Sequence, residues 1–346
     1  MTLRALALAL LALASPLNAA SWATRDVCDI DTLEIPKGWT TEQDIAEAKE
    51  RAKSIPNGTG RLWRIEGPGG AVSHLFGTLH SNDPLLLDLP EELESALESA
   101  RLVATEIDFR LPSRRLYRND PSETYRWRGA RANGADPPFE AELHSWTRLY
   151  FVGLGFKTPW AVLTDVGVAD LLLADPCNDF NTGVFPIMDN LIALEGVLSG
   201  AEFIGLEPPI TFFEELSRPE RSDELYGLLQ IYGAYTQPAV DNRARQATMT
   251  LYAQGHIGEM MAHDAIYLEG VFGPERATRF REDGNRYLLE DRNLAWIEKI
   301  EAELGLGGVV MAVGAFHLPG ETGLVSLLRK RGFTLTRIVA EGEVLR

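Results

Sequence analysis

Two Gly-x-x-His motifs lie near opposite ends of the chain. Gly77-Thr78-Leu79-His80 and Gly314-Ala315-Phe316-His317 each follow an apolar run that is typical of a buried strand. Imidazole is the commonest metal ligand in proteins and a general base near neutral pH, and a preceding glycine lets the backbone bend sharply. The repeat therefore predicts one site served by His80 and His317, with Gly77 and Gly314 as the structural residues of the motifs. The alternative is two histidines that cap separate turns.

Two glutamates stand at the ends of further apolar runs. Glu106 and Glu207 each close such a run, and Asp108 shares a face with Glu106 if that strand continues. Two histidines and one or two carboxylates are a common hydrolytic metal set, which leaves one position open for water. We expect His80, His317 and Glu106 to hold a divalent cation, with Zn, Mn and Co as the candidates. Glu106 and Glu207 are then the catalytic carboxylates; the alternative for either is a solvated strand end.

A third pair of polar residues lies in a helical pattern. Arg292 and Asn293 precede Trp296 on this pattern. An arginine beside an amide can bind a carboxylate or stabilise an oxyanion, so both are predicted to be catalytic. The alternative for Arg292 is a surface or salt-bridge residue.

A rival metal set lies on one helical face. His256, Glu259 and His263 are spaced i, i+3 and i+7, which matches no zinc motif on a helix. A solvated polar face is the simpler explanation. The sequence also lacks a Gly-x-Ser-x-Gly elbow, a Gly-x-Gly-x-x-Gly loop and a histidine near Cys177. These absences argue against a serine or cysteine nucleophile and against a nucleotide cofactor.

Short strands that alternate with helices must position these side chains. Strands are predicted over residues 62–65, 72–76, 102–107, 200–207, 309–313 and 333–339. Helices are predicted over 40–52, 90–100 and 324–328, and 211–304 is mainly helical. The turn Gly67-Pro68-Gly69-Gly70 predicts a hairpin. This alternation indicates an α/β fold with a mixed, largely parallel sheet surrounded by helices, which binds ligands at the carboxyl ends of its strands.

The chain divides by composition into three parts. Residues 1–20 predict a secretory signal peptide, because Arg4 precedes an Ala/Leu-rich run that ends in small residues. Residues 21–59 form an N-terminal arm, and 60–346 form the α/β domain. Within that domain, the less regular residues 110–200 predict an inserted helical layer or cap. We therefore expect an exported protein of the periplasm or the extracellular space.

Charge and cysteine content limit the partners. The formal net charge of −17 argues against nucleic acid and against anionic membrane surfaces. No segment beyond the signal reaches the roughly 20 apolar residues of a membrane span, so no stable membrane insertion is expected after cleavage. Export permits a disulfide between Cys28 and Cys177; two separate buried thiols are the alternative.

Several of these segments together resemble the TraB/GumN family, which includes the Tiki proteins. The resemblance lies in Leu62-Trp63-Arg64-Ile65, Phe76 to His80, Ser99 to Asp108, Asp189, Leu191, Gly205-Leu206-Glu207, Asp291-Arg292-Asn293 and Val313 to Gly320. It implies a fold shared with the erythromycin-esterase-like and ChaN-like proteins, and an active site built from both Gly-x-x-His motifs. In Tiki proteins these motifs serve a divalent-metal-dependent protease. The chain departs from the family at Gly255-His256-Ile257, where Gly-Asp-Leu is expected.

Carried over by position, the resemblance implies a site of His80, His317 and Glu106. Glu207, Arg292 and Asn293 would support it. The expected function is an exported, metal-dependent hydrolase acting on a peptide or another carbonyl-containing substrate. A metal-free variant would use one histidine as a general base on water. The alternative function is a non-catalytic envelope protein that binds haem, metal or a peptide signal.

Overall fold

The computed structural model describes residues 28, 30–108, 125–126, 137–153, 162–174, 177–178, 186–237, 242–340 and 342–343. The predicted signal peptide and much of the predicted insertion lie outside these residues. The strands are β1 (Leu62–Glu66), β2 (Val72–Thr78), β3 (Leu102–Ile107), β4 (Glu202–Glu207), β5 (Val309–Gly314) and β6 (Thr334–Ile338).

In the described chain these strands form one sheet in the order β4-β3-β5-β2-β1-β6. The neighbours β4, β3, β5 and β2 are parallel, whereas β1 is antiparallel to both β2 and β6. The predicted mixed, largely parallel sheet is therefore confirmed. So is the hairpin, in which Gly67 and Ala71 close the turn between β1 and β2.

Both faces of the sheet are covered by helices. The helices against it are α3 (Glu91–Glu98), α8 (Met188–Leu198), α14 (Arg292–Leu306) and α15 (Leu324–Lys330). Side chains alternate along a strand, so Val309, Met311 and Val313 of β5 pack with α14 and α15. Val310 and Ala312 pack with α3 and α8 on the other face. A central strand buried on both sides explains why β5 is apolar at nearly every position.

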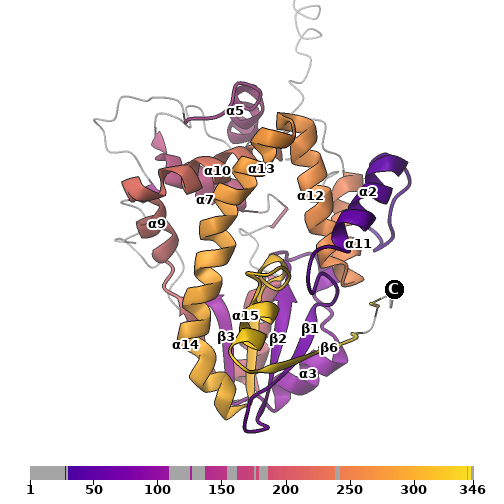
Figure 1. The fold of residues 1–346 in the computed structure, drawn as a ribbon, viewed down its shortest axis with the longest axis vertical. Helices are drawn as coiled ribbons and strands as arrows, with labels where there is room; N and C mark the ends of the chain where they lie inside the picture. The colour runs from indigo at the N-terminus through magenta and orange to yellow at the C-terminus, as the bar shows by residue number, and fades with distance from the viewer. Residues whose placement is uncertain are drawn as a thin grey trace, which may run out of the picture.

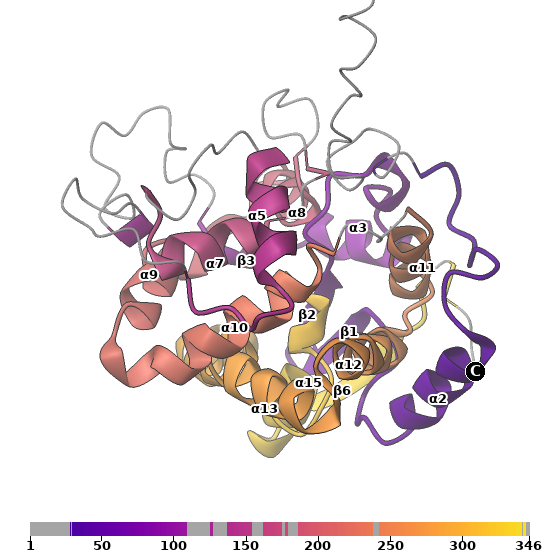
Figure 2. The same cartoon turned by 90° about the horizontal axis from the view of Figure 1, so that it is seen from above.

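A layer of helices lies beyond one end of the strands (Figures 1 and 2). This helical layer consists of α5 (His144–Gly153), α7 (Asp165–Leu173), α10 (Ser222–Ala234), α12 (Ile257–Phe272) and α13 (Pro274–Asn285). Its members share an apolar core of their own. Helix α12 contacts the 3-10 turn Ala315–His317 that follows β5, so the layer adjoins the carboxyl ends of the parallel strands.

The helical layer draws on more of the chain than the predicted insertion. Helices α5 and α7 come from residues 110–200, but α10, α12 and α13 come from the region that was predicted to be mainly helical. Helix α8 also falls within 110–200, and it packs on β3 and β4 of the sheet. Further α-helices in the part of the chain that the structure describes are α2 (Glu42–Ala52), α9 (Thr211–Leu216) and α11 (Asn242–Ala253).

The N-terminal arm is attached to the body at several places. Thr41 caps α2, within the predicted helix 40–52, by accepting a hydrogen bond from the Asp44 amide, and α2 packs along α12. Cys28 forms a disulfide with Cys177, which settles the two alternatives left by the sequence. Among the described helices, none is both long and apolar enough to cross a membrane.

Candidate functional site

The carboxyl edge of the parallel strands brings the predicted site residues together. His80 follows β2, Glu106 and Glu207 lie at the ends of β3 and β4, and His317 follows β5. The Glu106 Oε1 atom lies 3.6 Å from His80 Nε2 and 3.8 Å from His317 Nε2. The two Gly-x-x-His motifs therefore converge on one carboxylate oxygen.

His80 is oriented by a residue that was not predicted to belong to the site. Its Nδ1 atom is 2.9 Å from Asp189 Oδ2, and Thr78 donates a hydrogen bond to the other carboxylate oxygen at 2.8 Å. Asp189 lies in the first turn of α8, where the helix dipole stabilises a negative charge. An Nδ1–H donated to this carboxylate leaves Nε2 of His80 directed at Glu106. Asp189 is one of the residues that carry the resemblance to the family, but no sequence pattern indicated that it belongs to the site.

His317 is oriented in a comparable way by an amide. Asn293 Oδ1 lies 2.8 Å from His317 Nδ1, and its Nδ2 donates to the carbonyl oxygens of His317 and Thr322. Nδ1–H is the donor that an amide oxygen accepts, so Nε2 of His317 keeps its lone pair. Asn293 was predicted to be catalytic, and its contacts make it the residue that fixes the His317 ring.

Arg292 joins the two strand-end glutamates. It donates to Glu106 Oε2 at 2.6 Å and to Glu207 Oε1 at 2.7 Å, and its Nη1 lies 3.5 Å from His317 Nε2. All three side chains are about nine-tenths buried. Trp296 supports the group by donating to Glu207 and by packing under the guanidinium. Arg292 is thus a buried salt-bridge residue within the site.

The backbone before Arg292 has an uncommon form. Residues Arg286–Asp291 make a π-helical turn between α13 and α14. Such turns cost stability and occur frequently at functional sites. The carbonyl oxygen of Leu288, within this turn, accepts a hydrogen bond from Arg292. The turn therefore contributes to the placement of the guanidinium.

Glu106 and both site histidines have displaced pKa values. Burial opposes ionisation of Glu106, but Arg292 and both histidines outweigh it and hold the pKa of this carboxyl well below its usual range. The neighbouring Asp189 raises the pKa of His80 to about 9. Burial lowers the pKa of His317 to about 3. At neutral pH and without a metal, Glu106 is therefore charged, His80 is protonated and His317 is neutral.

The raised pKa of His80 predicts a pH dependence of stability. A group whose pKa is raised by folding stabilises the protein fully below its ordinary value of 6.5, and this contribution is lost as the pH rises to about 9. We expect the difference in unfolding free energy between the wild type and His80→Gln to shrink over that range. Urea unfolding in the presence of a chelator measures it. A difference that is constant with pH contradicts the His80–Asp189 ion pair.

The two motif glycines have different surroundings. A Cβ on Gly314 would lie 3.2 Å from both Glu106 Oε1 and His80 Nε2, so this glycine borders the site. Its amide also donates to Glu106 Oε1 at 2.7 Å. A Cβ on Gly77 would instead approach Ala315 Cα and Leu318 Cδ2 at 3.0 Å. Gly77 is therefore needed for packing between β2 and the turn after β5.

The rival set on α12 does not form a three-ligand group. His256 lies 3.6 Å from Glu259, whereas the His263 ring packs on Trp39 of the N-terminal arm. The explanation as a solvated polar face was wrong, because His256 and Glu259 are both buried. Of the described residues, His80, Glu106 and Asp189 form the set of three whose ligand atoms all lie within 4.8 Å of one another.

The site contains side chains of the types that bind divalent cations. Two imidazoles and a carboxylate are the ligand types that zinc and similar cations take, and here the Nδ1 atom of each imidazole already has a partner. The carboxylates of Glu106, Glu207 and Asp189 outnumber the cationic Arg292 and His80. The His80 side chain is 54% exposed, whereas the other members are mostly buried, so solvent reaches the site at His80.

Comparison with known proteins identifies a family. A model described as the TraB/PrgY/gumN family matches residues 61–337, which span both Gly-x-x-His motifs and most of the chain. No curated protein and no solved structure matches the chain.

Proposed function

The chain belongs to the TraB/PrgY/gumN family, and we propose that it is a hydrolase whose centre is His80, Glu106 and His317. The observation that carries this proposal is the position of Glu106 Oε1, less than 4 Å from the Nε2 atoms of both histidines. Each ring is also tethered through Nδ1, by Asp189 or Asn293. Tethered rings that converge on one carboxylate are arranged to act on a single ligand or water.

We include a divalent cation in this proposal. His80 Nε2, Glu106 Oε1 and His317 Nε2 would hold it, and Asp189 and Asn293 would fix the two rings. When bound, such a cation lowers the pKa of a water molecule and polarises a carbonyl oxygen. His80 must lose its proton to bind, so the affinity should rise with pH towards about 9.

The remaining residues have positioning roles in this proposal. Arg292 holds Glu106 in its charged form through Oε2, which leaves Oε1 facing the histidines. Glu207 holds Arg292, so it contributes through the guanidinium. The substrate would approach from the exposed side of His80 and present a carbonyl group, as a peptide does. Export is part of the proposal, and the Cys28–Cys177 disulfide supports it because disulfides persist in oxidising compartments.

A metal-free hydrolase is the second candidate. The contact between Arg292 Nη1 and His317 Nε2 favours it, because that lone pair then has a donor without a metal. In this variant water attacks the substrate carbonyl while Glu106 accepts its proton, and protonated His80 donates its Nε2–H to the leaving group at neutral pH.

Metal titration and peptide cleavage together test the proposal. Calorimetry with Zn²⁺, Mn²⁺ and Co²⁺ should show one site in the wild type and at least about 100-fold weaker binding in His80→Ala and His317→Ala, because each change removes a ligand. Cleavage of a peptide library, followed by mass spectrometry, should be lost in the same variants. His144→Ala, on α5 of the helical layer, is the matched control and should behave as the wild type.

The outcomes separate the candidates. Cleavage without any bound metal supports the metal-free hydrolase. Metal, haem or peptide binding without turnover supports a non-catalytic binding protein. Full metal affinity in a variant that combines His80→Ala with His317→Ala contradicts the shared site.

A further inference from the structure

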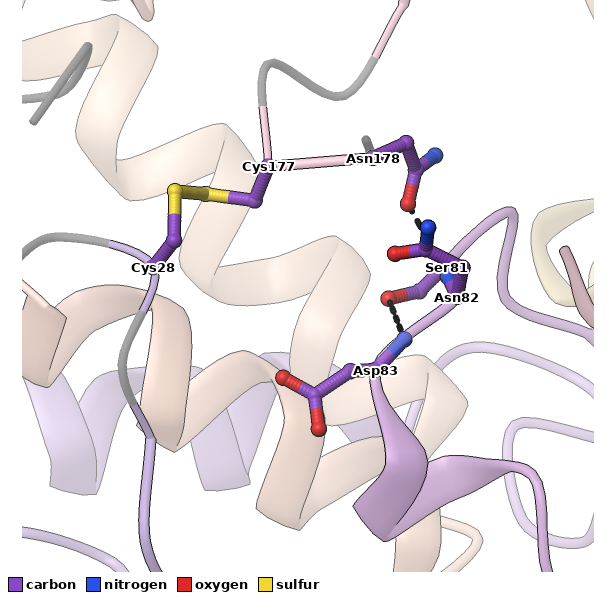
Figure 3. Close-up of a disulfide and its surroundings, with 6 residues drawn as sticks. All are labelled: Cys28, Ser81, Asn82, Asp83, Cys177 and Asn178. Carbon is purple, nitrogen blue, oxygen red and sulfur yellow. Dashed lines mark hydrogen bonds between the residues drawn. A yellow bond between two sulfur atoms is a disulfide. The ribbon is translucent and has the colours of Figure 1, made fainter. Parts of the chain in front are cut away.

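A buried amide holds the segment that carries His80. Asn178 Nδ2 donates to the carbonyl oxygen of His80 at 2.7 Å, and Asn178 Oδ1 accepts from the backbone amide of Asn82 at 2.9 Å. The second bond is visible in Figure 3. Asn178 is 7% exposed. Its two bonds go to the backbone on both sides of Ser81, so this one side chain fixes the turn as a unit.

Further hydrogen bonds between described residues hold the same turn. Strand β2 ends at Thr78, so His80 lies beyond the last hydrogen bonds of the sheet, and its side chain is largely exposed. The amide of Met188 donates to the carbonyl oxygen of Ser81 at 3.0 Å. The Asp83 amide donates to Ser81 Oγ at 3.2 Å, and the His80 ring is bonded to Asp189. Because the His80 side chain itself is largely exposed, its position should depend on these hydrogen bonds more than on packing, and Asn178 makes two of them.

A disulfide holds the backbone that carries this amide. Cys177 directly precedes Asn178 and is bonded to Cys28, 149 positions away in the sequence. Figure 3 shows Asn178 between the disulfide and the turn at Ser81 to Asp83. The crosslink ties the Asn178 backbone to the N-terminal arm, whose Ile30 and Leu33 pack on the core beside the sheet, and so limits how far the amide can move.

We propose that Asn178 is a positioning residue for His80, and that the Cys28–Cys177 disulfide acts on the site through Asn178. The amide keeps the His80 backbone where the ring can reach Asp189 with Nδ1 and Glu106 with Nε2. The proposal rests on the proposed function only in giving His80 a role. The placement of His80 can be measured without metal or substrate.

Hydrogen exchange and NMR of the His80 ring test the placement. In Asn178→Ala we expect the Asn82 amide to exchange about tenfold faster, because it loses its acceptor. We also expect loss of the low-field Nδ1–H resonance that an imidazole donor to a carboxylate produces. Asn178→Asp keeps the acceptor and removes the donor, so it should preserve protection at Asn82 and still lose the ring resonance. Gln246→Ala removes an amide tether elsewhere, to Thr32, and should change neither.

Removing the disulfide, alone and together with Asn178→Ala, tests whether it acts through Asn178. Cys28→Ser with Cys177→Ser should reproduce the faster exchange and the loss of the ring resonance, in addition to lowering Tm. In an Asn178→Ala background, the same two changes should still lower Tm but should add nothing to the two local signals. Reduction of the folded wild type with a thiol provides the same comparison if the serine variant fails to fold.

Two results would overturn the proposal. An unchanged Asn82 exchange rate and ring resonance in Asn178→Ala would show that Asn178 does not position His80. Further local loosening by the serine changes in that background would show that the disulfide acts by another route. Neither result depends on whether the protein binds metal or cleaves peptides. Failure of this proposal can therefore be distinguished from failure of the proposed hydrolase function.

Discussion

Arg292→Met should lower the free energy of unfolding by about 3–5 kcal/mol, because it leaves two buried carboxylates without their counter-charge. The guanidinium is the shared partner of Glu106 and Glu207, and each of these side chains is only 9–10% exposed. Water therefore cannot replace the lost ion pairs at little cost. Urea unfolding at neutral pH, with a chelator present, measures the loss.

Two comparisons test the reason for this loss. Arg292→Lys keeps the charge but not the forked geometry, so it should recover only part of the stability. Glu106 gains its stabilisation above its ordinary pKa of about 4.3 and loses it as the pH falls, so the deficit of Arg292→Met should shrink below about pH 4. A deficit under about 1 kcal/mol, or one that grows in acid, would show that the ion pairs are not the cause.

Gly314→Ala should weaken cation binding and turnover by about 100-fold, because small displacements of site atoms have effects of that size. The added methyl group would lie 3.2 Å from both Glu106 Oε1 and His80 Nε2, within the space that the proposed cation would occupy. Gly314 has a φ of −49°, so the backbone itself tolerates alanine. The crowding should cost about 1–3 kcal/mol of stability. Calorimetry with Zn²⁺ and urea unfolding give the two quantities.

Gly77→Ala is the matched control from the other motif. Its methyl group would clash with Ala315 Cα and Leu318, away from the site atoms. We expect a comparable loss of stability with cation affinity nearly unchanged in the folded protein. Equal losses of affinity in both variants would show that the Gly314 effect is only a general loosening of the strand ends.

Much of the fold could be predicted from local patterns. The apolar runs around Ile65, Phe76 and Met311 are strands, and the region predicted to be mainly helical ends in α14, which buries Trp296, Ile300 and Leu304 on one face. These predictions succeed because burial of a strand or helix face requires a fixed period of apolar residues. The extent of the helical layer was harder to predict, because α8 has the same apolar character as the layer but packs on the sheet.

The site was predictable only where it coincides with strand ends. Glu106 and Glu207 close strands and the two histidines follow strands, so the sequence marks all four. Asp189 and Asn178 carry no such signal. Asp189 lies in a helix 109 positions from its partner His80, and Asn178 adjoins a cysteine whose pairing the sequence left open. Contacts at such separations depend on how the layers pack.

By itself, the sequence determined which polar side chains stand at the carboxyl ends of strands, because a parallel sheet brings those ends to one edge. The tertiary structure alone decided what each of them faces. Asp189 reaches the edge from α8 on one side of the sheet, whereas Arg292 and Asn293 reach it from α14 on the other. The physical reason is that packing against both faces sets these partners, and it also sets the pKa of each buried group. As a result, His80 of the first motif is exposed and protonated, whereas His317 of the second motif is buried and neutral.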